Sequence, residues 1–375
     1  MLLTLFVAVS FFWAVGVAAW VSQRFKSPLL MPRISIIVAG RNEEQFIGSC
    51  LDALLRQDYD AGACEVIFVD DHSTDGTLAI AEELAAHSEG RLTVVSAPPC
   101  PAAVGPKKHA ISHGVARAKG EILLFTDADC RVRPGWAKAM LSTYDDRTGA
   151  VTGPVVPPAG SGLARLMLRL ERIFVSYSSA SAIGWKHPAS ASGGNFSYRA
   201  AAYREIGGIA HSHVTSGDDD LMAQGIARSG WRVAYARGAN AVVEHLRLPT
   251  VRQEVNATIR HQSTVRYYPL LWRIAYALSI VSSIGALMSV ACSSFDTKLW
   301  LYVAVALGIR MLIEGFSVRL FCRQYGMRLS LPQFVAGEIC LPVFLVLRSA
   351  LSLSPSFSWH ARTHHVSAVQ EPDSL

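Results

Sequence analysis

Charged residues are distributed very unevenly along this chain, and that distribution constrains its fold more than any other feature. The first 21 residues, MLLTLFVAVSFFWAVGVAAWV, contain no charged side chain, and the chain becomes apolar again after about residue 270. A helix of about 20 apolar residues is long enough to span a bilayer. Charged residues make up 17% of the whole chain, whereas a soluble domain carries about 25%. The sequence therefore predicts membrane helices at both ends of a polar domain.

The N-terminal segment, residues 1–22, is predicted to be an uncleaved transmembrane anchor. A cleaved signal peptide would begin with basic residues and end at a small-residue cleavage site, but this segment begins without Lys or Arg. Arg24 and Lys26 follow it directly. By the positive-inside rule, we expect its C-terminal end to lie in the cytoplasm. The protein would then be integral to the cell (inner) membrane, with its polar domain cytoplasmic.

The overall charge argues against a nucleic-acid partner, and the cysteines argue against a zinc site or a disulfide framework. The net charge is +6, yet Lys and Arg form no dense basic block, so we expect no nucleic-acid partner. The seven cysteines include no C-x-x-C pair, which predicts reduced thiols rather than a zinc site or a disulfide framework.

The C-terminal region contains three apolar stretches. Residues 272–292 and 299–318 are long enough to span a bilayer, whereas residues 331–353 could cross, re-enter or lie at the interface. Arg310 and Glu314 are four residues apart, so they share a helix face and could pair. Around the start of the first stretch, Arg residues occur with Tyr267, Tyr268 and Trp272, a composition typical of a membrane interface.

Between these apolar ends, strand and helix patterns alternate. Short β-branched runs predict buried strands, and the stretches after them predict helices; the strands are 34–38, 65–69, 92–95 and 121–125, and the helices 42–56, 75–86 and 107–118. This order predicts an α/β fold with a doubly wound, mostly parallel sheet. Ligands bind such sheets at the carboxyl ends of the strands.

Two acidic clusters lie at predicted strand ends. Asp127-Ala128-Asp129 follows the strand 121–125, and two carboxylates with this spacing can face a divalent cation and a diphosphate together. Their hard oxygen ligands suit Mg²⁺ or Mn²⁺. Asp71 lies at the end of the strand 65–69, where a carboxylate can accept hydrogen bonds from a nucleotide base or ribose, and Asp75 is expected to cap the next helix.

A third acidic cluster, Asp218-Asp219-Asp220, precedes a helical run that ends at Gly230. Adjacent carboxylates repel one another, which raises a pKa unless cations or donors compensate. One of the three could act as a general base. A solvated helix start remains the alternative at this point.

In this order, the motifs resemble those of the family 2 glycosyltransferases. The resemblance covers residues 34–268 and is specific for the superfamily but not for the acceptor; the matching runs are 35–44 (SIIVAGRNEE), 69–77 (VDDHSTDGT), 105–110 (GPKKHA), 125–130 (FTDADC), 193–199 (GGNFSYR), Asp218-Asp219 and 230–233 (GWRV). The run from Asp218 to Trp231 also resembles the ceramide glucosyltransferases, which are integral membrane enzymes.

The resemblance implies a GT-A fold, a nucleotide-sugar donor and a divalent metal ion, Mg²⁺ or Mn²⁺. It implies that Asp71 meets the nucleotide, and that Asp127 and Asp129 meet the diphosphate and the metal. It also implies that Asp219 is the catalytic base, with Asp218 in place of the usual Glu. The remaining residues assigned to donor binding are Ala39, Arg41 and Glu43 of the first motif, with Lys107, Lys108 and Arg260 as positive charges.

The sequence departs from the family pattern at two places. Ala39 replaces the usual Pro after the first strand, which is a mild change. The Q-x-x-R-W motif of processive synthases appears as residues 257–261, ATIRH, with Arg260 retained and Gln and Trp absent. In processive relatives this segment helps to hold the growing polymer, so its erosion argues against polymer synthesis.

We therefore expect four parts: an anchor at 1–22, a GT-A catalytic domain at 33–268, transmembrane or interfacial helices at 270–355 and a tail at 356–375. The expected activity is inverting transfer of a hexose from a nucleotide sugar, preferably a UDP-sugar, to a membrane lipid or lipid-linked acceptor. The alternatives are a processive polysaccharide synthase and a non-catalytic nucleotide-sugar-binding membrane protein. A Rossmann dehydrogenase would need G-x-G-x-x-G after the first strand, where this chain has AGRN.

Overall fold

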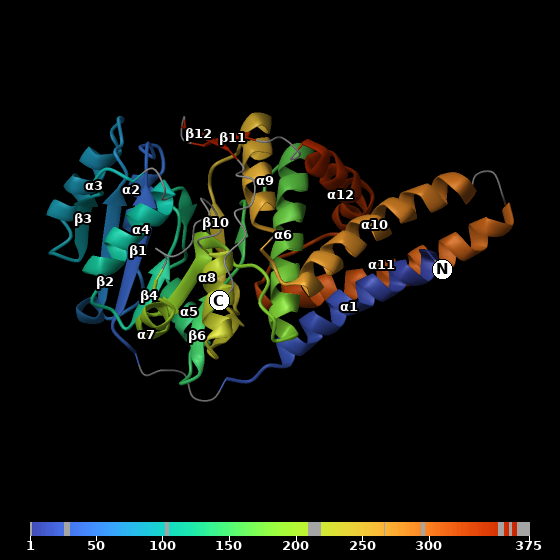
Figure 1. Cartoon of the computed structure of the whole chain (residues 1–375), viewed down its shortest axis with the longest axis horizontal. Helices are drawn as coiled ribbons and strands as arrows, with labels where there is room; N and C mark the ends of the chain where they lie inside the picture. Colours follow the sequence, from blue (N-terminus) through green and yellow to red (C-terminus); the bar gives the residue numbers. More distant parts are fainter. Residues whose placement is uncertain are drawn as a thin grey trace.

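The protein consists of an α/β domain and an elongated bundle of apolar helices that extends from it (Figure 1). The computed structural model describes residues 2–25, 31–101, 105–208, 219–265, 267–293, 297–351, 356–359 and 362–365.

A mixed seven-stranded sheet forms the centre of the α/β domain. Its order is β3 (Leu92–Ser96), β2 (Cys64–Asp70), β1 (Ile34–Gly40), β4 (Ile122–Phe125), β8 (Phe196–Arg199), β6 (Thr148–Thr152) and β9 (Arg232–Tyr235). The four strands of the first half are parallel, β8 is antiparallel to both of its neighbours, and β6 and β9 are parallel to each other. The predicted α/β fold with a mostly parallel sheet is confirmed.

Short helices cover the sheet and bury their apolar faces against it. They are α2 (Ile47–Leu55), α3 (Thr77–Ala86), α4 (Pro106–Arg117), α5 (Trp136–Leu141), α7 (Ala200–Glu205) and α8 (Asp220–Arg228). The helix predicted from residue 42 begins only at Ile47. Before it, the backbone N–H groups of Asn42, Glu43 and Glu44 donate to side chains of the loop after β2 and of the start of α3. These bonds hold the segment outside a helical path.

A second sheet of three short strands lies beside the carboxyl end of β4. Its order is β5 (Cys130–Arg131), β10 (Val243–His245) and β7 (Val155–Val156). Because β5 directly follows Asp129, this sheet brings a distant part of the chain, β10, next to the Asp-x-Asp motif.

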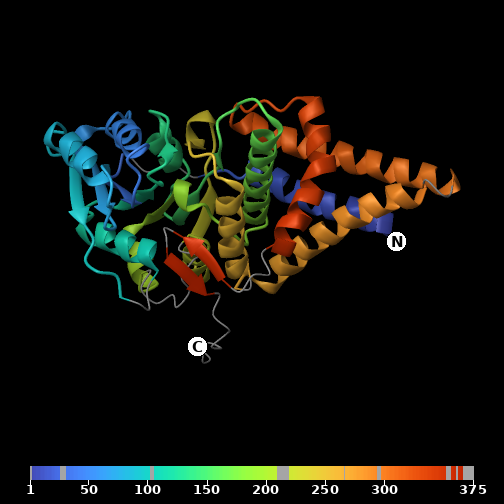
Figure 2. The same ribbon diagram turned by 90° about the horizontal axis from the view of Figure 1, so that it is seen from above.

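Two long helices, α6 (Leu163–Gly184) and α9 (Val251–Val265), stand between the large sheet and the bundle (Figure 2). Arg172 of α6 and Glu254 of α9 form an ion pair of 3.4 Å between the two helices.

The bundle contains α1 (Leu2–Ser22), α10 (Leu270–Ser293), α11 (Thr297–Gln324) and α12 (Leu331–Leu351). Three segments are long and apolar enough to cross a membrane: Thr4–Ser22, Leu270–Ser293 and Leu299–Gln324. In α12, the described apolar part, Leu331–Leu341, is shorter. Large apolar side chains such as Leu301, Leu312 and Phe316 are exposed on the outside of the bundle, as expected of a lipid-facing surface.

Helix α1 packs tightly against the α/β domain as well as against the bundle. A methyl group added to Gly184 of α6 would overlap the carbonyl oxygen of Gly16, so the two backbones touch where the helices cross. At the end of α1, Trp20 is fully buried; its ring packs on Phe321 of α11, and its indole N–H donates to the carbonyl oxygen of Tyr235 in β9 (3.2 Å). The N-terminal helix is therefore part of the core.

Polar side chains inside the bundle form a connected group. Arg310 and Glu314 of α11 pair at 3.1 Å, as the sequence predicted. Ser10 of α1 donates a hydrogen bond to Glu314, and Glu338 of α12 lies 3.7 Å from the Arg310 guanidinium. Charged groups are costly in an apolar bundle unless they are paired, so this group favours one fixed arrangement of α1, α11 and α12.

Two of the three aromatic residues at the start of α10 are packed inside the protein. Tyr268 and Trp272 are buried, and only Tyr267 is substantially exposed. The Trp272 ring stacks on Trp13 of α1 at 5.8 Å. Large aromatic rings packed between helices bury much apolar surface, which stabilises the fold.

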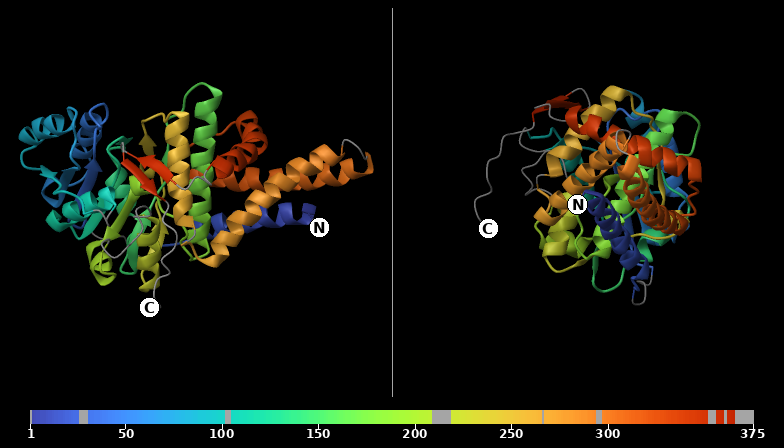
Figure 3. Two further views of the ribbon diagram at one scale, coloured as in Figure 1. Left: turned by 45° about the horizontal axis from the view of Figure 1, so that its top comes forward. Right: turned by 90° about the vertical axis from the view of Figure 1, so that its right-hand side faces the viewer.

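The bundle geometry generates a prediction about orientation. The end of α10 and the start of α11 lie at the end of the bundle farthest from the α/β domain, and the N-terminus of α1 lies near that end (Figure 3). Basic residues such as Arg24 and Arg273 lie at the near end. We expect a reporter that is active only outside the cytoplasm to be inactive when fused after residue 30 and active when fused near residue 295. The same readout at both positions would contradict this topology.

Candidate active site

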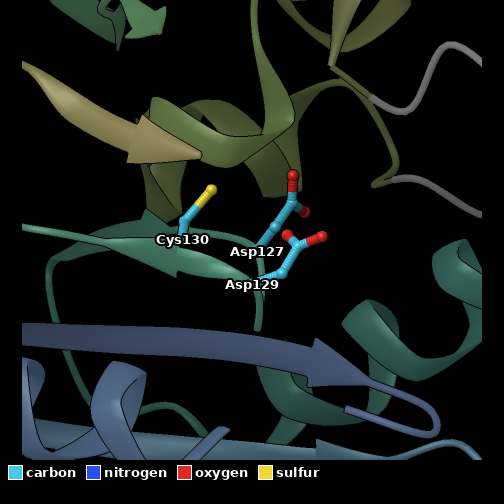
Figure 4. A group of neighbouring side chains, drawn as sticks. All are labelled: Asp127, Asp129 and Cys130. Atoms are coloured by element: carbon cyan, nitrogen blue, oxygen red, sulfur yellow. The ribbon is translucent and has the colours of Figure 1, made fainter. Parts of the chain in front are cut away.

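The Asp-x-Asp motif lies where β4 ends, at the carboxyl edge of the sheet. Thr126 donates a hydrogen bond to the carbonyl oxygen of Gly194 (2.9 Å) and fixes the start of the motif. The side chains of Asp127 and Asp129 then lie side by side, with Cys130 next to them (Figure 4). Asp127 accepts from the Lys107 ammonium of α4 at 2.6 Å.

Asp129 is surrounded by two residues that follow each other closely in β10 and just after it. His245 pairs with Cys130 in the antiparallel β5–β10 register, and its Nε2 lies 3.4 Å from Asp129 Oδ2. Arg247 Nε donates to the same oxygen at 3.0 Å. Burial disfavours the charged carboxylate, but His245 and Arg247 outweigh it and hold the pKa of Asp129 well below its usual range.

Arg247 also bonds to Glu43 of the first motif. Burial and the nearby charge of Asp129 raise the pKa of Glu43 to about 7, against the opposing effect of Arg247. Arg247 therefore connects the first motif to the Asp-x-Asp motif, and its positive charge is shared by two carboxylates.

These residues fit a divalent metal ion. Ligand atoms of Asp127, Asp129 and Cys130 all lie within 4.8 Å of one another. Carboxylates suit Mg²⁺ and Mn²⁺, and His245 lies beside them, with its Nε2 3.4 Å from Asp129 Oδ2. Burial and the two Asp charges raise the pKa of the Cys130 thiol well above its usual range. Mg²⁺ and Mn²⁺ prefer oxygen ligands to soft sulfur ligands, so we do not expect Cys130 to bind the ion.

A small cavity of about 170 Å³ brings together nearly all the residues assigned to donor binding. Its lining includes, from those predictions, Ala39, Arg41, Glu43, Asp71, Lys107, Asp127, Asp129 and Arg260. Lys108 is the exception: it is almost fully buried and is not among the described residues that line this cavity or the larger one. Its role in binding stays a prediction.

Two side chains that line the small cavity have buried polar atoms without a hydrogen-bond partner among the described residues. Asp71 is buried, and its Oδ1 has no hydrogen-bond partner among the described residues; the same is true of Nε and Nη1 of Arg41. Buried polar atoms are almost always hydrogen-bonded in folded proteins. An oxygen acceptor and a guanidinium donor left open in one cavity match a polar ligand such as a nucleotide.

A larger cavity of about 670 Å³ continues from the metal-site residues to the helices α6 and α9. Asp127, Asp129 and Asp219 line one part of it, and α6 and α9 contribute side chains such as Val175 and Arg260 to the other. The cavity therefore extends from the Asp-x-Asp motif to the helices that adjoin the bundle.

Asp219 occupies the N-terminus of α8, next to a loop that we call the linking loop, residues 189–195. Its Oδ2 accepts from the Gly193 N–H at 2.6 Å and its Oδ1 from the Asp220 N–H at 2.9 Å. A methyl group on Gly193 would lie 3.2 Å from Asp219 Oδ2 and 3.3 Å from Lys107 Nζ. Asp219 and Lys107 thus face one small space that glycine keeps open. Asp218, the other predicted catalytic residue, lies outside the described residues.

His245 and Arg247 were not found by sequence reasoning. They lie more than 110 positions after the Asp-x-Asp motif, as the Arg247–Asp129 sequence separation of 118 shows, and only the pairing of β10 with β5 brings them there. The available sequence signal is the short strand-like run Val242-Val243, which is followed by three titratable residues, Glu244, His245 and Arg247.

Comparison with known proteins assigns the family. A family model described as "Glycosyl transferase family 2" matches residues 35–207, and one described as "Glycosyl transferase family group 2" matches residues 122–350. The chain belongs to glycosyltransferase family 2. The predicted membership is therefore confirmed.

Individual relatives match this family 2 member over shorter segments. A beta-monoglucosyldiacylglycerol synthase of Nostoc sp. is 36% identical over 122 residues, 32% of this chain and 25% of the relative. A poly(ribitol-phosphate) beta-glucosyltransferase of Bacillus spizizenii is 34% identical over 141 residues, 36% of this chain and 21% of the relative. The chain spans less than half the length of the curated relatives that it matches.

The fold is shared over almost the whole chain with a solved structure. The mannosyltransferase PcManGT from Pyrobaculum calidifontis, in complex with GDP-Man and Mn²⁺, aligns with 94% of this chain and 99% of its own, at a TM-score of 0.58 and 18% identity. This likeness confirms the GT-A fold expected for the family.

The geometry of the carboxylates predicts metal binding that can be measured without activity. Mn²⁺ should raise the melting temperature of the wild type, because a ligand that binds only the folded state stabilises it. Asp129→Asn should remove this rise, because it removes a charged hard ligand. Cys130→Ala should keep it, because the buried thiol is not expected to bind the ion. An equal Mn²⁺ effect in the wild type and Asp129→Asn would contradict the assignment.

Proposed function

We propose that this protein is an inverting glycosyltransferase that moves one hexose from a nucleotide sugar, preferably a UDP-sugar, to a membrane lipid or lipid-linked acceptor at the cytoplasmic face. The observation that carries the proposal is the continuity of the cavities. They run from the open polar atoms of Asp71, past Asp127 and Asp129, to Asp219 and the helices beside the bundle.

Each proposed donor contact has a chemical reason. Asp71 and Arg41 would bind the nucleotide with the atoms that lack partners in the protein. Asp127, Asp129 and His245 would hold Mg²⁺ or Mn²⁺, which supplies positive charge to the leaving diphosphate when it is bound. Lys107, already 2.6 Å from Asp127, would add a second positive charge at the same place.

The proposed reaction is one direct displacement. A sugar or lipid hydroxyl is a weak nucleophile near neutral pH, so a carboxylate must take its proton during attack. Asp219 would accept that proton while the acceptor oxygen bonds to the anomeric carbon. The bond from that carbon to the diphosphate oxygen breaks, and the electron pair leaves with the nucleoside diphosphate. A single displacement inverts the anomeric centre.

The position of the large cavity favours a lipid acceptor. Its α6 and α9 walls adjoin the apolar bundle, so a lipid could present its polar end without leaving the membrane. A relative matched over 32% of this chain is a beta-monoglucosyldiacylglycerol synthase, which gives independent support for a glycerolipid. The absence of Gln and Trp around Arg260 supports transfer of a single sugar.

The role of Asp219 can be tested with one substitution. Asp219→Asn should lower the turnover of sugar transfer by about 10²–10⁴-fold, because a general base is lost. Binding of the nucleoside diphosphate should survive, since its contacts lie in the smaller cavity. The exposed Asp146→Asn serves as the matched control and should behave as the wild type. Near-normal turnover of Asp219→Asn would move the base to another residue.

The acceptor can be tested by product analysis. The purified protein, supplied with nucleotide sugars, Mn²⁺ and lipids extracted from its native membrane, should yield one discrete glycolipid on a thin-layer plate. A ladder of long products would establish the processive alternative. Labelling of soluble acceptors alone would remove the lipid assignment.

A further inference from the structure

Asp220, the residue after the proposed base, connects the catalytic domain to the start of a candidate membrane helix. Its side chain is buried, with 6% of its surface exposed. Its Oδ1 accepts from the Ala191 N–H of the linking loop at 2.8 Å, and its Oδ2 accepts from the Tyr268 hydroxyl at 2.6 Å. Tyr268 lies two residues before α10 begins at Leu270.

The other end of this connection is the active site. Asp219 and Asp220 are adjacent, and they bind the N–H groups of Gly193 and Ala191, which lie two positions apart in the same loop. The two carboxylates therefore hold one short segment of backbone. A displacement of Asp220 would therefore also move Asp219 relative to the small space beside Gly193 that Asp219 and Lys107 face.

The position of Tyr268 depends on the bundle. Its ring packs against Tyr276 of α10, with centroids 6.3 Å apart, and Tyr276 packs against Trp13 of α1 at 5.5 Å. The Tyr268 side chain is itself buried. The hydroxyl is thus placed by the packing of α10 against α1.

We propose that Tyr268 is a positioning residue for the transfer reaction, and that it sets the place of Asp219 through Asp220 when α1 and α10 are packed together. This inference rests on the proposed function. A misplacement of about 1 Å can cost about 10²-fold in rate. The packing of the membrane helices would therefore control the catalytic step.

The test removes one hydroxyl and leaves the ring. Tyr268→Phe should lower kcat of transfer by about 10-fold or more, while the KM for the donor and the affinities for UDP and GDP stay unchanged, because the lost interaction matters only to the transition state. Tyr267→Phe makes the same chemical change at the neighbouring, exposed position and should retain the wild-type kcat.

A second variant tests the route through Asp220. If Tyr268 acts through this carboxylate, Tyr268→Phe should lower kcat less in an Asp220→Asn background than in the wild type, because residues that act together are not additive. Full additivity would overturn the route. Wild-type kcat in Tyr268→Phe, or a parallel loss of kcat and nucleotide affinity, would overturn the positioning role.

Hydrogen exchange gives a readout that does not need activity. Exchange of the Ala191 and Gly193 amides should be faster in Tyr268→Phe than in Tyr267→Phe, because the carboxylates that accept from them are held less firmly. Unchanged exchange would overturn the inference. If exchange is faster in Tyr268→Phe than in Tyr267→Phe but the wild type transfers no sugar, the proposed function is overturned and the connection through Asp220 is not.

Discussion

The linking loop is the part of the molecule on which the active site depends, because side chains of four elements bind its backbone. Ser179 of α6 donates to the Ser190 carbonyl oxygen, and Gln224 of α8 donates to that of Ala189. Thr152 of β6 accepts from Ser192 N–H, and Thr126, just after β4, donates to the Gly194 carbonyl oxygen. Each hydrogen bond contributes only about 1 kcal/mol to stability. The loop is therefore held in place by the sum of these bonds and not by any single one.

This loop explains how separate motifs form one site. Asp127 follows Thr126 on one side of the loop, and Asp219 binds Gly193 on the other. At its end, the buried Asn195 side chain donates to the carbonyl oxygens of Pro154 and Ala241 and accepts from the Trp136 indole. Small residues suit the middle of the loop, since a side chain at 193 would fill the space between Asp219 and Lys107.

The charges of the site are balanced locally. Arg247 binds both Glu43 and Asp129, and Lys107 binds Asp127. Buried charges are tolerated when they are paired and hydrogen-bonded. The bundle follows the same rule at Arg310, where Glu314 and Glu338 face the guanidinium. In both places, removing one partner would leave a buried charge, so the pairing favours a single arrangement of the elements that carry it.

The α/β pattern, the length and apolar composition of the three long helices and the Asp-x-Asp motif at the end of β4 can all be predicted from the sequence. Each of these depends on local periodicity or on residues that are adjacent in the chain, such as Asp127 and Asp129. The sequence also indicates residues that meet in the smaller cavity. Ala39 lies at the end of β1, and Asp71 and Asp127 follow β2 and β4, so all three lie where the carboxyl ends of parallel strands share one edge of the sheet.

Which distant residues join them depends on the tertiary fold. His245 and Arg247 reach Asp129 because β10 pairs with β5, and Tyr268 reaches Asp220 because α10 packs on α1. The aromatic residues around the start of α10 have the composition of a membrane interface, yet Tyr268 and Trp272 are buried. Trp13 of α1, far away in the sequence, packs on Trp272 directly and on Tyr276, which in turn packs on Tyr268. Periodicity reports which side of an element is apolar, but it carries no information about which other element covers that side.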